Sequence, residues 1–168
     1  MNTPAEMRIP LKVEEARLRM HLENICFLRS QVLNPIAVER AVRYIEQEFR
    51  SYGLEVGADE FYHWLTVWRR NKNITAGFPH ADPKAPCLII GAHYDAVPFS
   101  PGADDNGSGV AVLLEAARVL SRSDFPSHLQ VRFVAFAMEE NGMIGSQHYV
   151  ETLFKNRTPV AGMLSLEC

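Results

Sequence analysis

The sequence has little of several features that define whole classes of protein. Its 168 residues include only three cysteines, Cys26, Cys87 and Cys168, which are too widely spaced for a disulfide framework or a cysteine-based zinc knuckle. No apolar run is long enough to span a bilayer, and the N-terminus lacks the apolar core of a secretory signal. We therefore expect a soluble, cytoplasmic protein in which Cys26 and Cys87 are buried as small hydrophobic residues.

An excess of charge of one sign is also missing. The chain has 17 Lys and Arg against 20 Asp and Glu, mixed along its length, for a net charge of -3. Nucleic acids and anionic membrane surfaces bind clustered basic residues, so neither is an expected partner. A hydrophobic content of 47% is ordinary for a globular protein and fits one domain over residues 1–168.

Apolar periodicity divides the chain into helices and strands. Two amphipathic helices are expected over 11–29 and 34–53, followed by two or three edge strands over 54–78 with a polar break at 69–73. Buried strands over 87–90, 129–138 and 160–166 then alternate with helices over 107–122 and 143–154. This order predicts a three-layer α/β fold with a mixed, mainly parallel central sheet flanked by helices.

The two N-terminal helices are expected to pack on the sheet through apolar stripes, with their charged residues facing solvent. The first stripe consists of Leu18, Met20, Leu22, Ile25, Cys26 and Leu28. The second consists of Val38, Ala41, Val42, Ile45 and Phe49, after Asn34 as the N-cap and Pro35 in the first turn. Neither helix carries a cluster of ligand residues.

Acidic and imidazole side chains follow each of the three buried strands. They are His93 with Asp95, Glu139 with Glu140, and Glu167. Because sites in an open α/β sheet form outside the carboxyl ends of the strands, we expect these side chains to converge. Clustered carboxylates repel one another unless a cation neutralises them. One histidine with several carboxylates suits Zn²⁺, with Mn²⁺ or Co²⁺ as substitutes.

Each of these signals has an ordinary explanation when it stands alone. A His-x-Asp pair can end a strand by chance, and Glu-Glu often lies in a solvated turn. The sequence Asp104-Asp105-Asn106-Gly107 is also typical of a helix start, with Asp105 or Asn106 available as the cap. Their occurrence together at successive strand ends favours the metal site.

Three segments carry a family resemblance: GAHYDAVPFSPGADDNGSGVAVLLEAARVL, VRFVAFAMEENGMIGSQHYV and GMLSLE. They resemble the two-zinc exopeptidases of the aminopeptidase Y and aminopeptidase S type, a family that includes glutamate carboxypeptidases and, more distantly, glutaminyl cyclases. The pattern covers roughly residues 36–168. It implies a zinc-dependent hydrolase that removes N-terminal residues from peptides with a free N-terminus.

The resemblance also implies a set of metal ligands. His93 and Glu167 would bind the first metal, and Glu140 would bind the second. Asp104 would bridge the two metals. A cis peptide bond between Asp104 and Asp105 is implied as well.

Two further residues would take part in the chemistry. Asp95 would hydrogen-bond the His93 imidazole and fix its tautomer. Glu139 would act as the general base on the water shared by the metals and then protonate the leaving amine.

One ligand of the family pattern is not in this sequence, namely a histidine well after the position of Glu167. His148 lies within a predicted helix and is expected to be an ordinary surface histidine. We therefore expect an N-terminal portion of a longer enzyme, with an incomplete sheet and an apolar edge at its last strand. Two other hypotheses stay open, a single-zinc acyltransferase like the glutaminyl cyclases and an inactive homologue that acts as a binding module.

Overall fold

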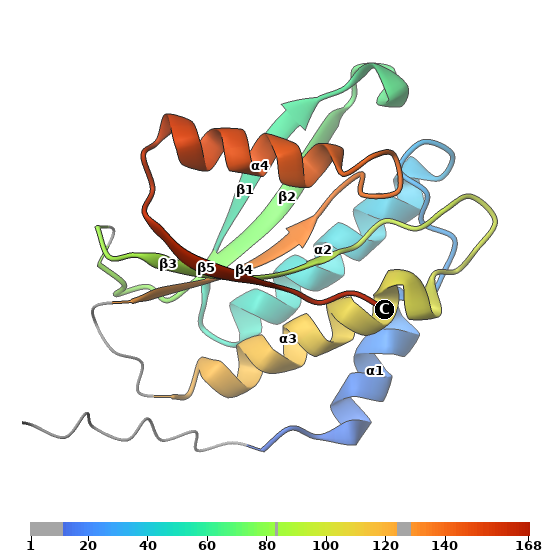
Figure 1. Cartoon of the computed structure of the whole chain (residues 1–168). Helices are drawn as coiled ribbons and strands as arrows, with labels where there is room; N and C mark the ends of the chain where they lie inside the picture. The colour runs from blue at the N-terminus through green and yellow to red at the C-terminus, as the bar shows by residue number, and fades with distance from the viewer. Residues whose placement is uncertain (1–11, 83, 124–128) are drawn as a thin grey trace, which may run out of the picture.

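A computed structural model of the chain describes residues 12–82, 84–123 and 129–168. In this part of the chain a five-stranded sheet lies between two layers of helices (Figure 1). Helix α4 covers one face of the sheet, while α1, α2 and α3 lie on the other. None of the helices in the described ranges has the length and apolar run needed to cross a membrane.

The main elements follow one another in the expected order. They are α1 (Glu15–Ile25), α2 (Pro35–Ser51), β1 (Glu55–Tyr62), β2 (Arg70–Gly77), β3 (Cys87–His93), α3 (Gly109–Leu120), β4 (Gln130–Phe136), α4 (Ile144–Lys155) and β5 (Val160–Ser165). Two short helical segments, η1 (Trp64–Thr66) and η2 (Ala103–Ser108), lie between them.

The strand order in the sheet is β1-β2-β4-β3-β5. Strand β3 pairs in parallel with β4 and with β5, whereas β2 pairs antiparallel with β1 and β4. The predicted α/β class with a mixed sheet is therefore confirmed. Because β3, β4 and β5 run in the same direction, their carboxyl ends lie at one edge of the sheet.

The core divides into two clusters because side chains alternate between the faces of a strand. On β4, Val131, Phe133 and Ala135 pack toward α2 and α3. The intervening Val134 and Phe136 pack with Tyr149 and Leu153 of α4. Both faces of the central strands are thus buried, which explains their nearly continuous apolar sequence.

Helix α2 matches its prediction closely. Its buried residues are the five of the expected stripe, Val38, Ala41, Val42, Ile45 and Phe49. Pro35 occupies the first turn, but the side chain of Asn34 makes no capping hydrogen bond. The apolar spacing therefore determined this helix more strongly than its cap.

Helix α1 is shorter than predicted, and the predicted stripe is partly wrong. Its buried residues are His21 and Ile25, whereas Met20 is 36% exposed and the nearby Leu28 is 46% exposed. His21 can be buried because its Nδ1 lies 2.7 Å from the hydroxyl oxygen of Tyr44. Apolar spacing alone cannot identify a buried histidine whose hydrogen-bond partner lies on another helix.

The break between the first two strands also differs from its prediction. The chain turns between Tyr62 and Arg70, so that most of the predicted 69–73 break belongs to β2. The turn includes η1 and two residues with left-handed backbone, Val67 (φ 53°) and Trp68 (φ 56°). The buried Thr66 stabilises it by donating its hydroxyl to the carbonyl oxygen of His63, at 2.8 Å.

Strand β5 was predicted as an apolar strand that would lack its usual cover in this chain, and its side chains are largely exposed. Val160, Met163 and Leu164 are 49%, 48% and 54% exposed. β5 pairs with β3 at the end of the strand order, so it has a neighbouring strand on one side only. The exposed side chains match the apolar edge that was expected at the last strand.

Candidate metal centre

Three strand ends bring the candidate residues together. His93 is the last residue of β3, and Glu139 and Glu140 follow β4 after a short turn. Glu167 follows β5, where the amide of Leu166 donates to the carbonyl oxygen of Gly91 at 2.8 Å. The predicted convergence at the carboxyl edge of the sheet is present.

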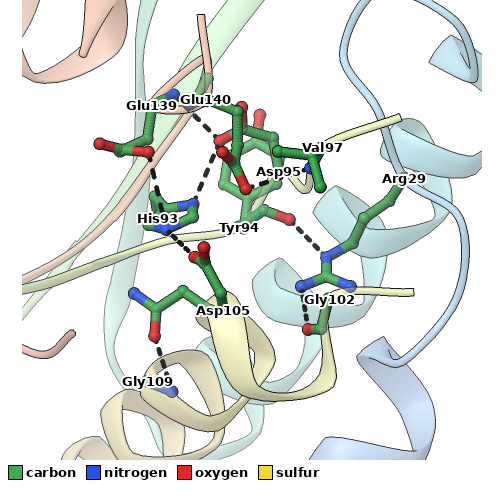
Figure 2. Close-up of polar contacts among 12 residues, drawn as sticks. Arg29, His93, Tyr94, Asp95, Val97, Gly102, Asp105, Gly109, Glu139 and Glu140 are labelled. Atoms are coloured by element: carbon green, nitrogen blue, oxygen red, sulfur yellow. Dashed lines mark hydrogen bonds and ion pairs between the residues drawn. The ribbon is translucent and has the colours of Figure 1, made fainter. Parts of the chain in front are cut away.

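The imidazole of His93 lies at the centre of this group. Its Nε2 lies 3.0 Å from Asp105 Oδ1, 3.2 Å from Glu167 Oε1 and 3.8 Å from Glu139 Oε2. His93 is buried, whereas the side chains of Asp105 and Glu167 are about half exposed. Ligand atoms of His93, Asp105 and Glu167 all lie within 4.8 Å of one another. Figure 2 shows Asp105 and Glu139 pointing toward the imidazole.

The structure corrects the position of the aspartate by one residue. Asp105, not Asp104, points toward His93, and the cis peptide bond joins Asp105 and Asn106. Asp104 is not in the three-residue ligand group, and its carbonyl oxygen accepts a hydrogen bond from Ser108 Oγ at 2.7 Å. Because the backbone leaves helical geometry at Asp105 and Asn106, a helical period could not tell which of two adjacent carboxylates points inward.

Asn106 fixes the start of α3 relative to the end of β5. Its Oδ1 accepts a hydrogen bond from the amide of Gly109 at 3.0 Å, and its Nδ2 donates to the carbonyl oxygen of Leu166 at 2.8 Å. Of the two predicted caps, Asn106 is thus the one that binds the helix start. Its second bond holds the residue next to Glu167, a role that the local sequence does not reveal.

Asp95 is fully buried and supports the turn after β4. Its Oδ1 accepts from the amide of Glu139 at 3.1 Å, and its Oδ2 accepts from the amide of Glu140 at 3.2 Å. The same Oδ1 lies 3.5 Å from His93 Nδ1, which is long for a hydrogen bond. Asp95 is therefore beside the imidazole, as the resemblance implied, and it also holds the backbone that carries both glutamates (Figure 2).

Burial and neighbouring carboxylates change the pKa values of His93, Glu139 and Glu140. Burial by itself lowers the pKa of His93, but nearby carboxylates, Asp95 foremost, outweigh it and raise the pKa to about 9. Burial raises the pKa of Glu139, and the charge of Asp95 adds to this rise while that of His93 opposes it. Burial also raises the pKa of Glu140, with Asp105 acting in the same direction. A bound cation would relieve this repulsion.

These residues fit a divalent metal ion. Within the described ranges, no Lys or Arg forms an ion pair with Asp105, Glu139 or Glu167. An imidazole nitrogen and two carboxylates provide three ligands from the protein, the number typical of a catalytic zinc site with one open position. The donor set is therefore suitable for Zn²⁺.

Glu140 and His148 lie apart from the three-residue ligand group. Glu140 Oε1 accepts a hydrogen bond from the amide of Val97 at 3.1 Å, so its role as a metal ligand stays a prediction. His148 is half-buried, with Nδ1 3.0 Å from Asp59 Oδ2 and its ring stacked on Phe61 at 5.0 Å. The expectation of an ordinary surface histidine is wrong, because His148 has specific partners on β1.

Sequence reasoning missed Arg29, which follows α1. Charged residues of this segment were expected to face solvent, but Arg29 is fully buried and donates to the carbonyl oxygens of Tyr94 and Gly102 (Figure 2). No local signal in the sequence distinguishes it from the exposed arginines. Its acceptors are 65 and 73 residues away in the chain.

A cavity of about 670 Å³ opens next to the ligand group. His93, Glu139 and Glu167 line one part of it, and apolar side chains such as Phe136 and Met163 line another. The combination of a few polar groups with an apolar wall is typical of binding sites for small ligands.

Comparison with known proteins assigns the family. Residues 73–168 match peptidase family M28. The chain belongs to this family. Aminopeptidase YwaD of Bacillus subtilis (strain 168) is 59% identical over 66 residues, which are 39% of this chain and 14% of YwaD.

Solved structures of two proteins described as aminopeptidases share the fold. The LapA aminopeptidase of Legionella pneumophila matches with a TM-score of 0.79 and 24% identity, over 91% of this chain and 42% of that chain. BSAP, described as a zinc aminopeptidase from Bacillus subtilis, matches with a TM-score of 0.71 and 18% identity, over 86% of this chain and 66% of that chain. This chain thus spans less than half the length of YwaD and of LapA.

Proposed function

We propose that this M28 chain takes part in metal-dependent removal of N-terminal residues from peptides. The observation that carries the proposal is the approach of His93 Nε2 to Asp105 and Glu167, at 3.0 and 3.2 Å, with Glu139 at 3.8 Å. His93 and Glu167 lie at the ends of separate strands and Asp105 lies in η2, so their meeting is a property of the fold. The aminopeptidase names of the relatives support the reaction class.

His93, Asp105 and Glu167 would hold a first metal ion. Asp105 would also contribute to a second ion together with Glu140, in place of the bridging role first assigned to Asp104. We propose Zn²⁺ as the metal, with Mn²⁺ or Co²⁺ as substitutes. When bound, such ions lower the pKa of a coordinated water and polarise a carbonyl oxygen.

Glu139 would transfer the proton. Its side chain is 35% exposed and lines the same cavity as His93 and Glu167, so a water molecule can reach it. It would accept a proton from the attacking water and donate it to the leaving amine. A raised pKa suits this exchange, because a carboxylate near its pKa can both accept and release a proton. Asp95 keeps Glu139 in place by binding its backbone amide.

The proposed substrates are peptides with a free N-terminus. The cavity of about 670 Å³ beside His93 and Glu167 has room for a peptide end. Its apolar wall offers contacts for a side chain, and its acidic side offers partners for a protonated amine.

The test is release of the first amino acid from an unblocked peptide by the chain loaded with Zn²⁺, Mn²⁺ or Co²⁺. An N-acetylated peptide of the same sequence should stay intact. Glu139→Gln should reduce the rate by at least about 100-fold, as expected for removal of a general base. Glu15→Gln is the matched control, because Glu15 lies on α1, does not line the cavity, and pairs with the exposed Arg19.

Two outcomes would point away from the proposal. Cyclisation of a peptide that begins with glutamine, without hydrolysis, would favour the acyltransferase hypothesis. Metal binding without any turnover, with an affinity that Glu139→Gln does not change, would favour the hypothesis of a binding module.

A further inference from the structure

Arg29 is the largest fully buried side chain in the described part of the molecule. Its Nε donates to the carbonyl oxygen of Tyr94 at 2.7 Å, and Nη2 donates to that of Gly102 at 2.8 Å. Nη1 donates to the carbonyl oxygen of Ile25 at 3.0 Å and also contacts that of Pro101. Within the described ranges its hydrogen bonds all go to backbone carbonyls, and it has no ion-pair partner.

A buried guanidinium without a paired carboxylate is costly, so its presence needs a reason beyond packing. The position of its acceptors supplies one. Tyr94 lies between His93 and Asp95, and Gly102 lies three residues before Asp105. Arg29 therefore donates hydrogen bonds to both ends of the 94–102 loop. This loop separates His93 from Asp105 in the chain.

The interior of this loop has little structure of its own. Residues 94–102 contain no helix or strand, and Phe99 is 86% exposed with a left-handed backbone (φ 71°). Gly102 also has a positive φ of 55°, and a Cβ there would lie 2.9 Å from Arg29 Nη2 and 2.6 Å from the carbonyl oxygen of Asp105. The guanidinium, Gly102 and the backbone of Asp105 are thus packed against one another with no spare space.

We propose that Arg29 is a positioning residue for the metal centre. By tying Tyr94 to Gly102, it keeps His93 and Asp105 at ligand distance although they lie at opposite ends of a loop. The guanidinium donates to the two ends from different nitrogens of one rigid plane, whereas a lysine has only one nitrogen at the end of a flexible stem. The consequence for metal binding rests on the proposed function, whereas the consequence for the loop does not.

The test compares Arg29→Met and Arg29→Lys with Arg118→Met as the matched control. Arg118 is also buried, at 8% exposure, but it bonds to Glu115 and to the carbonyl oxygen of Lys12, away from the loop. Two quantities are measured on each folded protein. They are hydrogen exchange of segment 94–107 in the metal-free chain and the Co²⁺ dissociation constant from the visible absorption of the bound ion.

Arg29→Met should speed exchange of segment 94–107 by about 10-fold or more relative to Arg118→Met, because local opening becomes easier. It should also weaken Co²⁺ binding by about 10- to 100-fold, the usual effect of losing a residue that orients metal ligands. Arg29→Lys keeps the charge but should show both effects, because lysine lacks the rigid set of nitrogens that binds Tyr94 and Gly102. Arg118→Met should leave Co²⁺ binding within about twofold of wild type, since no ligand changes position.

If Arg29→Met does not fold, Arg29→Lys decides the question with the same two measurements. A folded Arg29 variant whose loop exchange and Co²⁺ affinity equal those of Arg118→Met overturns the inference. A wild-type chain that binds no Co²⁺ overturns the proposed function. In that case faster loop exchange in the Arg29 variants alone still supports the role of Arg29 in holding the loop.

Discussion

Asn73 is completely buried in β2 and joins three elements through its side-chain amide. Its Oδ1 accepts from the backbone amide of Ala137 at 3.0 Å, just before the turn that carries Glu139. Its Nδ2 donates to the carbonyl oxygen of Gly145 at 2.8 Å and to Asp59 Oδ2 at 2.9 Å. Asn73→Ala would leave the buried groups of Ala137 and Gly145 without these partners.

The expected loss of stability follows from these three hydrogen bonds. Each contributes about 1 kcal/mol, and a buried group left without a partner costs about 1–3 kcal/mol. We therefore expect Asn73→Ala to lower the free energy of unfolding by about 3 kcal/mol or more. For a protein of this size, that corresponds to a fall in Tm of about 6–12 °C.

Urea unfolding followed by circular dichroism measures this change directly. Asn24→Ala is the matched control, because Asn24 lies on the exposed side of α1 and makes one bond, to the carbonyl oxygen of Met20 at 2.8 Å. The midpoint should fall for Asn73→Ala with an unchanged denaturant slope. Equal stability of the two variants, within about 0.5 kcal/mol, would refute this account of how the turn after β4 is held.

Two further predictions concern the same region. In the metal-free chain, the pKa of His93 is raised from 6.5 to about 9, which stabilises the fold by about 3 kcal/mol below pH 6.5. This contribution should disappear as the pH rises to about 9, and a pH series of unfolding curves should show no such loss in His93→Gln. Gly145→Ala should destabilise strongly in thermal unfolding, because its Cβ would lie 2.1 Å from the carbonyl oxygen of Ala137. Gly77→Ala, whose Cβ would lie at an ordinary 3.5 Å from its nearest neighbour, should have a smaller effect.

The sequence predicted those parts of the molecule that depend on local pattern. The stripe of α2 follows from the helical period, because the five residues predicted for it are the buried residues of the helix. The meeting of His93, Glu139 and Glu167 follows from the direction of parallel strands, which places successive strand ends at one edge. Neither inference required knowledge of distant side-chain contacts.

The remaining features depend on contacts that the local sequence does not encode. Asp105 points inward in place of Asp104 because the backbone is not helical at Asp105 and Asn106. Arg29 and His21 are buried because partners far along the chain satisfy their polar atoms. β5 is exposed because it is the last strand in the order of the sheet, and its apolar sequence does not predict that position.

The central claim is that His93, Asp105 and Glu167 form a metal site, with Asp105 as the ligand and not its neighbour Asp104. Calorimetric titration with Zn²⁺ tests this most directly in wild type, Asp105→Asn and Asp104→Asn. We predict tight binding by wild type, a loss of at least about 100-fold for Asp105→Asn, and affinity within about twofold of wild type for Asp104→Asn, because only Asp105 would be a direct ligand. Absence of Zn²⁺ binding by wild type, or a larger loss for Asp104→Asn than for Asp105→Asn, would contradict the claim.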